Sequence, residues 1–376
     1  MSAAPLRLSH VVENLNRGGL ERVVIDLARA QRELGYDCQV VCLFEPGTLA
    51  GELQAAGVPV HACAKRGGLD LGAIARLRGH LRRHRTQVLH THNATAHYHA
   101  VAAALGLGIQ RTINTRHGMG VQQAAGRREW LFRRTLARTD LVVTVCEAAR
   151  REVLAKGLIR SSRLAAIPNG IRTEAFEPAN ASRREALVHE LGLTPGTRLV
   201  GAVGRLNWAK DPATLVRAFR RVHERHPDTA LAWIGDGALR TEIQALARAE
   251  GIADRVLLLG DRSDVPRLLA GLDVYAMSSL TEGYSIALLE ACAAALPIVA
   301  TDVGGNGEIV REGVNGVLVP AGGAQQLADA ISTLLHAPAQ AAAMGSAGRQ
   351  WALLQGSLRN MAMRYASAYG EPPPQA

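Results

Sequence analysis

Short apolar runs alternate with longer amphipathic stretches along most of the chain. The runs 6–12, 38–44 and 87–91 are rich in Val and Leu, and each leads into a polar or glycine-containing segment. The stretches 69–83 and 96–105, which lie before and after the third run, have helical composition and spacing. Strands that alternate with helices predict a parallel sheet covered on both faces, so the expected fold class is α/β.

The same alternation restarts in the second half of the chain. The expected strands there are 199–203, 230–234, 256–260, 272–277 and a run beginning at Pro297. A length of 376 residues suits two domains of ordinary size. The segment AIPNGIR, residues 166–172, combines Pro, Asn and Gly in a turn at which the chain leaves the first domain. Residues 173–195 are expected to form a polar connection, and the tail from Gln325 is expected to form two amphipathic helices.

The most informative stretch is residues 278–308, SSLTEGYSIALLEACAAALPIVATDVGGNGE. A buried strand leads into a turn with Gly283 and then into a helical stretch, and unpaired N–H groups at such a helix start bind phosphate. Glu282 and Glu290 bracket this helix start, where they are suited to accept hydrogen bonds from sugar hydroxyls. The alternative is that Glu282 caps the helix and Glu290 is a solvated surface charge.

Two other glycine turns follow strands. Gly18 and Gly19 come after the first strand, and without side chains they let backbone N–H groups approach a ligand closely. In GRLNWAK, residues 204–210, Arg205 and Lys210 suit two adjacent phosphates, with Arg as a fork and Lys as a point charge. The alternatives are an ordinary turn for the glycines and solvated surface charges for the two basic residues.

Histidines gather in the first half. His90, His92, His97 and His99 are crowded enough to suggest a metal, but the last two fall on different faces of a helix, so a metal site is the disfavoured reading. His117 follows the strand RTINTR and stands before Gly118, which places it at a strand end.

Composition is that of a globular protein, with 48% apolar residues, and no uninterrupted apolar run is long enough to span a bilayer. The N-terminus lacks a signal-peptide core, and five cysteines without CxxC spacing indicate neither disulfides nor zinc, so a reducing cytoplasm is expected.

The formal net charge of +10 comes from the first half of the chain. Its basic residues concentrate in 76–85 and 127–138, where Trp130, Leu131 and Phe132 stand beside arginines. The alternatives are solvated helix faces or peripheral binding to an anionic membrane surface. No nucleic-acid-binding motif is visible, so nucleic acid is not an expected partner.

Taken together, the motifs resemble the retaining glycosyltransferases of family 4. The resemblance is carried by the E-x7-E pair in SLTEGYSIALLEA, by PIVATDVGGNGEIV and EGVNGVLVP, by G-R-L-x-x-x-K, by T-x-H-G around His117 and by AIPNGIR. Three positions depart from the family pattern: Cys146 stands where many members have Ser, Arg172 replaces the usual Asp, and Asp211 stands where Gly is frequent.

The resemblance covers nearly the whole chain and implies a GT-B fold, which is two Rossmann-like domains facing a cleft. It implies an N-terminal acceptor-binding domain over 1–172 and a C-terminal nucleotide-sugar-binding domain over 173–355. Residues 356–376 are then a helix that returns to the N-terminal domain, with a frayed tail.

The resemblance also implies roles for individual residues. The catalytic residues would be His117 and Glu282. The donor-binding residues would be Gly18, Gly19, Arg205, Lys210, Arg262, Glu282, Gly283, Tyr284, Ser285, Ile286 and Glu290. Asn16, His92 and Asn93 are candidates on the acceptor side. No metal or other cofactor is expected, because no DxD-like motif stands at a strand end.

The implied activity is transfer of a sugar, with retention, from a UDP- or GDP-linked donor to a glycan or lipid-linked acceptor. Such enzymes serve polysaccharide, lipopolysaccharide or glycolipid biosynthesis, and a cytoplasmic protein, peripheral on the inner face of the membrane, is expected. A nucleotide-sugar 2-epimerase of related fold and a non-catalytic sugar-nucleotide-binding partner protein are the alternatives. A dehydrogenase is excluded by the lack of a G-x-G-x-x-G turn after the first strand.

Overall fold

A computed structural model describes residues 5–16, 18–68, 70–118 and 127–370. The chain divides into two compact units, Met1–Gly170 with Leu358–Ala376, and Ile171–Ser357. They are called here the N-terminal and the C-terminal unit. Both boundaries fall close to those expected from the sequence, and the binding role of each domain stays a prediction.

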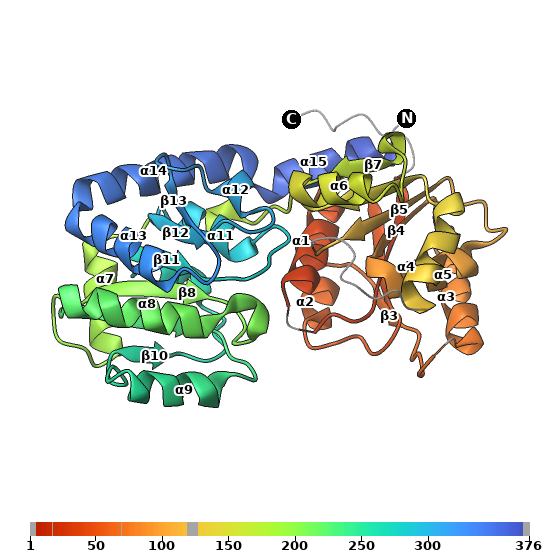
Figure 1. Ribbon diagram of the computed structural model, residues 1–376. Coiled ribbons are helices and arrows are strands. Elements are labelled where there is room, and N and C mark those ends of the chain that lie inside the picture. The colour runs from red at the N-terminus through yellow and green to blue at the C-terminus, as the bar shows by residue number, and fades with distance from the viewer. Residues whose placement is uncertain (1–4, 17, 69, 119–126, 371–376) are drawn as a thin grey trace. The chain divides into compact units, whose positions relative to one another are not determined.

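The N-terminal unit is built on a seven-stranded parallel sheet in the order β3-β2-β1-β4-β5-β6-β7 (Figure 1). Its strands are β1 (Arg7–Val12), β2 (Asp37–Cys42), β3 (Val60–Ala62), β4 (Val88–His92), β5 (Arg111–Arg116), β6 (Leu141–Thr144) and β7 (Leu164–Ala166). The chain order reverses between β1 and β4, which is where open parallel sheets bind ligands.

Helices cover both faces of this sheet. They are α1 (Gly19–Glu33), α2 (Ala50–Ala55), α3 (Leu71–Arg83), α4 (Asn93–Ala104), α5 (Arg127–Thr135), α6 (Glu147–Ala155) and α15 (Leu358–Tyr369). Because side chains alternate along a strand, Val11 packs with Leu77 of α3 and Ala96 of α4, while His10 points to the opposite face. On that face α1 and α15 pack together, so α15 returns to the N-terminal unit as expected.

The C-terminal unit has a six-stranded parallel sheet in the order β10-β9-β8-β11-β12-β13. Its strands are β8 (Arg198–Val203), β9 (Thr229–Ile234), β10 (Val256–Leu258), β11 (Val274–Met277), β12 (Ile298–Thr301) and β13 (Gly316–Val319). Its helices are α7 (Ala181–Glu190), α8 (Pro212–Arg225), α9 (Arg240–Ala249), α10 (Val265–Leu269), α11 (Ile286–Ala293), α12 (Asn306–Ile309), α13 (Ala324–His336) and α14 (Pro338–Gln355). The reversal of strand order here lies between β8 and β11.

Two expectations about elements are wrong. The segment 173–195 is not only a polar connection, because it contains the helix α7, which Asn180 caps by accepting from the Arg183 N–H at 3.0 Å. The tail from Gln325, as far as residue 370, holds three helices, α13, α14 and α15, in place of two, since breaks at Ala337 and Gly356 divide it. Among the described helices, none is long and apolar enough to cross a membrane.

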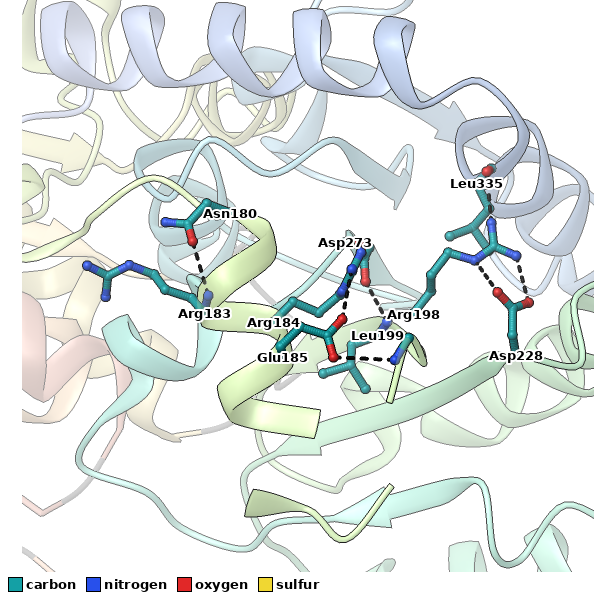
Figure 2. A network of polar contacts seen from close by, with 10 residues as sticks. Asn180, Arg183, Arg184, Glu185, Arg198, Leu199, Asp228, Asp273 and Leu335 are labelled. Carbon is teal, nitrogen blue, oxygen red and sulfur yellow. Dashed lines mark hydrogen bonds and ion pairs between the residues drawn. The ribbon is translucent and has the colours of Figure 1, made fainter. Parts of the chain in front are cut away.

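A polar network ties α7 to the amino-terminal ends of the strands (Figure 2). Arg184 of α7 pairs with Asp273 at 3.1 Å, and the other oxygen of that carboxylate accepts from the Leu199 N–H at 2.7 Å. Nearby, Arg198 donates to both oxygens of Asp228 at 2.7 and 2.8 Å and to the Leu335 carbonyl at 2.9 Å. These contacts fix one edge of the sheet, and the opposite, carboxyl-terminal edge carries the predicted site residues.

Candidate functional site

The loops after β8 and β11 are tied together at the point where the C-terminal sheet reverses. The Leu280 N–H donates to the Ala209 carbonyl at 2.9 Å. The Ser278 hydroxyl donates to the carbonyls of Lys210 and Asp211 at 3.0 and 2.8 Å. Residues about 70 positions apart in the sequence thus form one continuous rim at the carboxyl ends of two strands.

Backbone geometry explains the glycine turn after β8. Gly204 has a φ of +154°, and a Cβ there would lie 3.1 Å from Cε of Lys210. Its carbonyl accepts from the Trp233 indole N–H at 2.8 Å. Asp211 has a φ of +43°, in the left-handed region that glycine adopts most easily, and its side chain caps α8 by accepting from the Thr214 N–H. An Asp is therefore tolerated at a position where the family often has Gly.

Lys210 and Glu282 form an ion pair across this rim. The Lys210 Nζ donates to Oε1 of Glu282, and the Ser279 hydroxyl donates to the same oxygen at 2.6 Å. Both side chains are mostly buried, with exposed fractions of 21% and 11%. A partly desolvated, hydrogen-bonded pair is held in a defined position, unlike a solvated surface charge.

Glu290 lies within α11, on the same side of the unit. Burial raises the pKa of the Tyr275 phenol, and the negative charges of Glu290 and Glu282 raise it further. Ser285 caps α11 by accepting from the Leu288 N–H at 3.4 Å, which fixes the helix start between the two acids. Tyr284 is buried, and Ile286 is the first residue of the helix.

The remaining donor-side candidates differ in their surroundings. Arg205 is exposed on the rim, and the Leu206 N–H anchors its loop to the Asp236 carbonyl at 2.9 Å. The Gly283 carbonyl accepts from the Gly305 N–H at 2.9 Å, which joins the next glycine turn to the rim. Arg262 donates to both oxygens of Asp264 at 2.7 and 2.8 Å, so any base that it contacts competes with this pair.

In the N-terminal unit the sequence candidates lie around the corresponding reversal between β1 and β4. Asn93 has a φ of +62°, and its side chain accepts from the His117 N–H at 3.4 Å. Asn16 accepts from the Thr48 N–H at 3.3 Å. Gly18 is extended and is the N-cap residue of α1, and a Cβ at Gly19 would meet nothing within 4 Å. The protein's own packing therefore does not require glycine at position 19.

His92, which is buried, and His117, which is half-buried, belong to one row of imidazoles. His92 Nδ1 lies 3.0 Å from His117 Nε2, and His92 Nε2 lies 3.0 Å from His10 Nδ1. His10 Nε2 lies 2.7 Å from the Gln31 Oε1 atom of α1. His92 is 1% exposed, and both of its ring nitrogens are hydrogen-bonded. It therefore does not contact a ligand directly and acts on one only through His117.

Burial lowers the pKa of every histidine in this row. The pKa of His10 and that of His117 fall to about 4, and the pKa values of His90 and His92 fall well below the usual 6.5. Desolvation is the largest cause, because the imidazolium form loses its hydration inside the protein. The row is neutral at physiological pH.

The row includes a possible metal-binding group. His10, His90 and His92 each offer a ring nitrogen within 4.8 Å of the others. His90 Nδ1 lies 2.9 Å from the Tyr369 hydroxyl and His90 Nε2 lies 2.8 Å from the Thr115 hydroxyl, so every ring nitrogen of the three has a hydrogen-bond partner. Hydrogen bonding alone accounts for this arrangement. His97 and His99, which the sequence grouped with them, lie elsewhere, bonded to Thr91 and Thr95.

Sequence reasoning missed several members of this network, namely His10, Gln31, Tyr365 and Tyr369, and it named Thr115 only within the T-x-H-G motif. The one usable signal is the spacing of His90 and His92, which puts both rings on one face of β4. The helical residues that hydrogen-bond to the histidines of that face come from α1 and α15. No local sequence pattern predicts these contacts.

Comparison with known proteins finds two family models on the chain. The model described as Glycosyltransferase Family 4 matches residues 17–175, and the model described as Glycosyl transferases group 1 matches residues 183–351.

Individual relatives agree with these models. A protein of Mycolicibacterium smegmatis, named GDP-mannose-dependent alpha-(1-6)-phosphatidylinositol monomannoside mannosyltransferase, is 35% identical over 60% of this chain and 61% of its own, so the match spans less than two thirds of that relative. The UDP-Gal:alpha-D-GlcNAc-diphosphoundecaprenol alpha-1,3-galactosyltransferase of Escherichia coli is 26% identical over 84% of each chain.

Among solved structures, HepE of Anabaena in complex with UDP and glucose superposes with a TM-score of 0.86 at 22% identity, covering 97% of this chain and 99% of that one. This likeness shows the fold. With both halves matched by their family models and both sheets of the expected parallel type, the chain belongs to glycosyltransferase family 4 and has the GT-B fold.

Proposed function

We propose that the protein transfers a sugar from a nucleoside diphosphate sugar to a glycan or lipid-linked acceptor, with retention of anomeric configuration. The observation that carries the proposal is the Lys210–Glu282 pair, held where the C-terminal sheet reverses its strand order. Ligands of open parallel sheets bind at such reversals. Family membership makes a sugar donor the expected ligand.

The chemical difficulty of the reaction is the departure of a diphosphate, which develops negative charge. Lys210 has three donors, so it can keep Glu282 and still bind a phosphate oxygen. Arg205 on the same loop and the start of α11 add positive potential. These groups support a reaction in which protein side chains neutralise the leaving group and no metal is needed.

Glu282 and Glu290 would bind two further parts of the donor, the sugar and the ribose. We assign Glu282 to the transferred sugar, whose hydroxyls it would orient, and Glu290 to the ribose. Their positions on either side of the start of α11 support a shared ligand. The nucleoside diphosphate of the donor is UDP or GDP in this proposal, because the names of the two relatives mention UDP-Gal and GDP-mannose.

For the acceptor, the two relatives' names mention a phosphatidylinositol mannoside and a diphosphoundecaprenol-linked sugar. We therefore propose a lipid-linked or glycan acceptor bound by the N-terminal unit, near Asn16, Asn93 and His117.

The decisive experiment combines a binding screen with product analysis. UDP- and GDP-sugars are screened for the one that raises the melting temperature, since a ligand of the native state stabilises it. That donor is then incubated with short lipid-linked acceptors, with and without EDTA, and the anomeric configuration of the product is read by proton NMR. Retention that survives EDTA supports the proposal. An inverted product contradicts retention, and a donor epimerised at C2 without acceptor identifies the epimerase alternative.

Lys210→Ala and Glu282→Ala are each expected to lower kcat by about 100-fold or more, since each removes a charged group aimed at the reacting part of the donor. Lys156→Ala is the matched control, because Lys156 also forms an ion pair, with Glu152, but on an exposed helix surface. Steady-state kinetics and melting temperatures of the purified variants provide the test. Full activity in Lys210→Ala or Glu282→Ala contradicts the assignment.

A further inference from the structure

A continuous series of hydrogen bonds leads from Gln31 of α1 to His117, which directly follows β5. It runs from the Gln31 amide through His10 and His92 to His117 Nε2, with separations of 2.7, 3.0 and 3.0 Å. His117 Nδ1, at the end of this series, is buried and has no hydrogen-bond partner among the residues that the structure describes.

The orientation of the Gln31 amide sets the direction of the hydrogen bonds. A neutral imidazole has one N–H donor and one acceptor nitrogen. The Gln31 oxygen accepts, so His10 donates from Nε2 and accepts at Nδ1. His92 must then donate from Nε2 and accept at Nδ1, and His117 must donate from Nε2. His117 Nδ1 is left as a bare lone pair.

A second branch starts at the Gln31 amide and can run in either direction, because hydroxyl groups both donate and accept, so the His117 end decides the orientation. The Gln31 Nε2 donates to the Tyr369 hydroxyl at 2.7 Å, which in turn can donate to His90 Nδ1 at 2.9 Å. His90 Nε2 then donates to the Thr115 hydroxyl at 2.8 Å. The reversed orientation would leave an N–H on His117 Nδ1, and a buried donor without an acceptor is disfavoured.

We infer that Gln31, His10 and His92 are positioning residues that hold His117 in its Nε2–H tautomer, so that Nδ1 accepts a hydrogen bond from a hydroxyl of the sugar substrate. The inference rests on the proposed transferase function for the identity of the ligand. The tautomer itself depends only on contacts within the N-terminal unit.

The first test reads the tautomer directly. In protein labelled with ¹⁵N-histidine, protonated and bare ring nitrogens resonate far apart, and wild-type His117 is expected to show a protonated Nε2 and a bare Nδ1. Gln31→Leu removes the acceptor that sets the direction, so its His117 signals should move toward averaged positions, with kcat/KM lowered on the order of tenfold. Tyr365→Phe is the matched control, because it removes a buried hydroxyl from the Thr115 branch and leaves the Gln31–His10–His92–His117 chain intact.

The second test keeps the inference decidable if Gln31→Leu does not fold. The Asn side chain of His117→Asn places an oxygen near the Nδ1 position, whereas His117→Gln reaches only the Nε2 position. His117→Asn should therefore retain roughly ten times more activity than His117→Gln.

Three results would overturn the inference: a protonated Nδ1 on wild-type His117, equal activity of the two His117 variants, or Zn²⁺ titration that shifts the ring nitrogens of His10, His90 and His92 together. Absence of transfer by the wild-type protein, with the His117 tautomer as stated, would instead refute the proposed function alone.

Discussion

At the scale of single residues, buried imidazoles make the N-terminal unit sensitive to acid. His10, His90 and His92 are almost fully buried, and their pKa values are lowered by desolvation. In the unfolded chain the same side chains titrate near 6.5, so the unfolded state binds more protons in the interval below that pH. The stability that these residues contribute is complete above about 6.5 and is lost as the pH falls toward about 4.

The N-terminal unit is accordingly expected to lose about 1 kcal/mol of stability for each of His10 and His117 between about pH 7 and about pH 5.5. Hydrogen exchange followed by mass spectrometry, corrected for intrinsic rates, measures this for each unit separately. The C-terminal unit is the internal control, because its described histidines are all at least partly exposed. Equal acid sensitivity in both units would contradict the prediction.

The residues that could be predicted from sequence are those whose neighbours are close in the chain. Lys210 and Glu282 each stand beside a glycine turn that follows an apolar run, and the structure brings these two turns together. The Gln31–Tyr369 hydrogen bond joins residues 338 positions apart, and neither side chain belongs to a local pattern. Such a partner becomes visible only once the packing of α1 against α15 is known.

At the scale of elements, some arginines of the basic helices α3 and α5 bond within the fold and others are exposed. Arg76 and Arg78 of α3 donate to backbone carbonyls of the fold, at 2.6 Å for Cys63 and 2.9 Å for Ala103. On α5, Phe132 is buried and contacts His97 and Arg116, so it does not contribute to an exposed surface. Trp130 remains 55% exposed, with Arg134 over its ring.

The arginines of α3 and α5 that remain exposed predict binding to anionic membranes. Replacing the four exposed arginines by Glu should abolish salt-sensitive co-sedimentation with vesicles that contain anionic lipid, since each basic residue near such a surface contributes about 1 kcal/mol. The four are Arg82, Arg83, Arg133 and Arg134. The matched control is the same replacement of four exposed arginines of α8. These are Arg217, Arg220, Arg221 and Arg225. If the two quadruple variants bind equally well, the surface of α3 and α5 has no special role.

At the scale of the whole molecule, the chain passes between its units twice, at two neighbouring points. It leaves the N-terminal unit after Gly170 and returns at Leu358. Beside the crossing, Ile171 pairs with Ser357 in a parallel bridge, and the Ile171 N–H donates to the Gly356 carbonyl at 2.9 Å. The returning helix α15 then buries Met361, Tyr365 and Tyr369 in the N-terminal unit.

A chain that ends at Ser357 should therefore lose the structure of its N-terminal unit and keep that of the other. Cysteine labelling reads this out, because all five cysteines are free and buried. Cys38 and Cys42 of β2 should become reactive in the truncated chain, while Cys292 of α11 stays protected. Adding a peptide of residues 356–370 should restore protection. Unchanged protection of Cys38 in the truncated chain would show that α15 is dispensable.

The return of α15 also fixes an order of events during synthesis. A ribosome releases β1 and β4 early, but the helix that covers their histidine face is translated only after the entire C-terminal unit. The domain that is made first is thus the one that finishes folding last. Until α15 is translated, one face of the N-terminal sheet stays partly uncovered in the nascent protein. Protection by chaperones is expected to matter most during this interval.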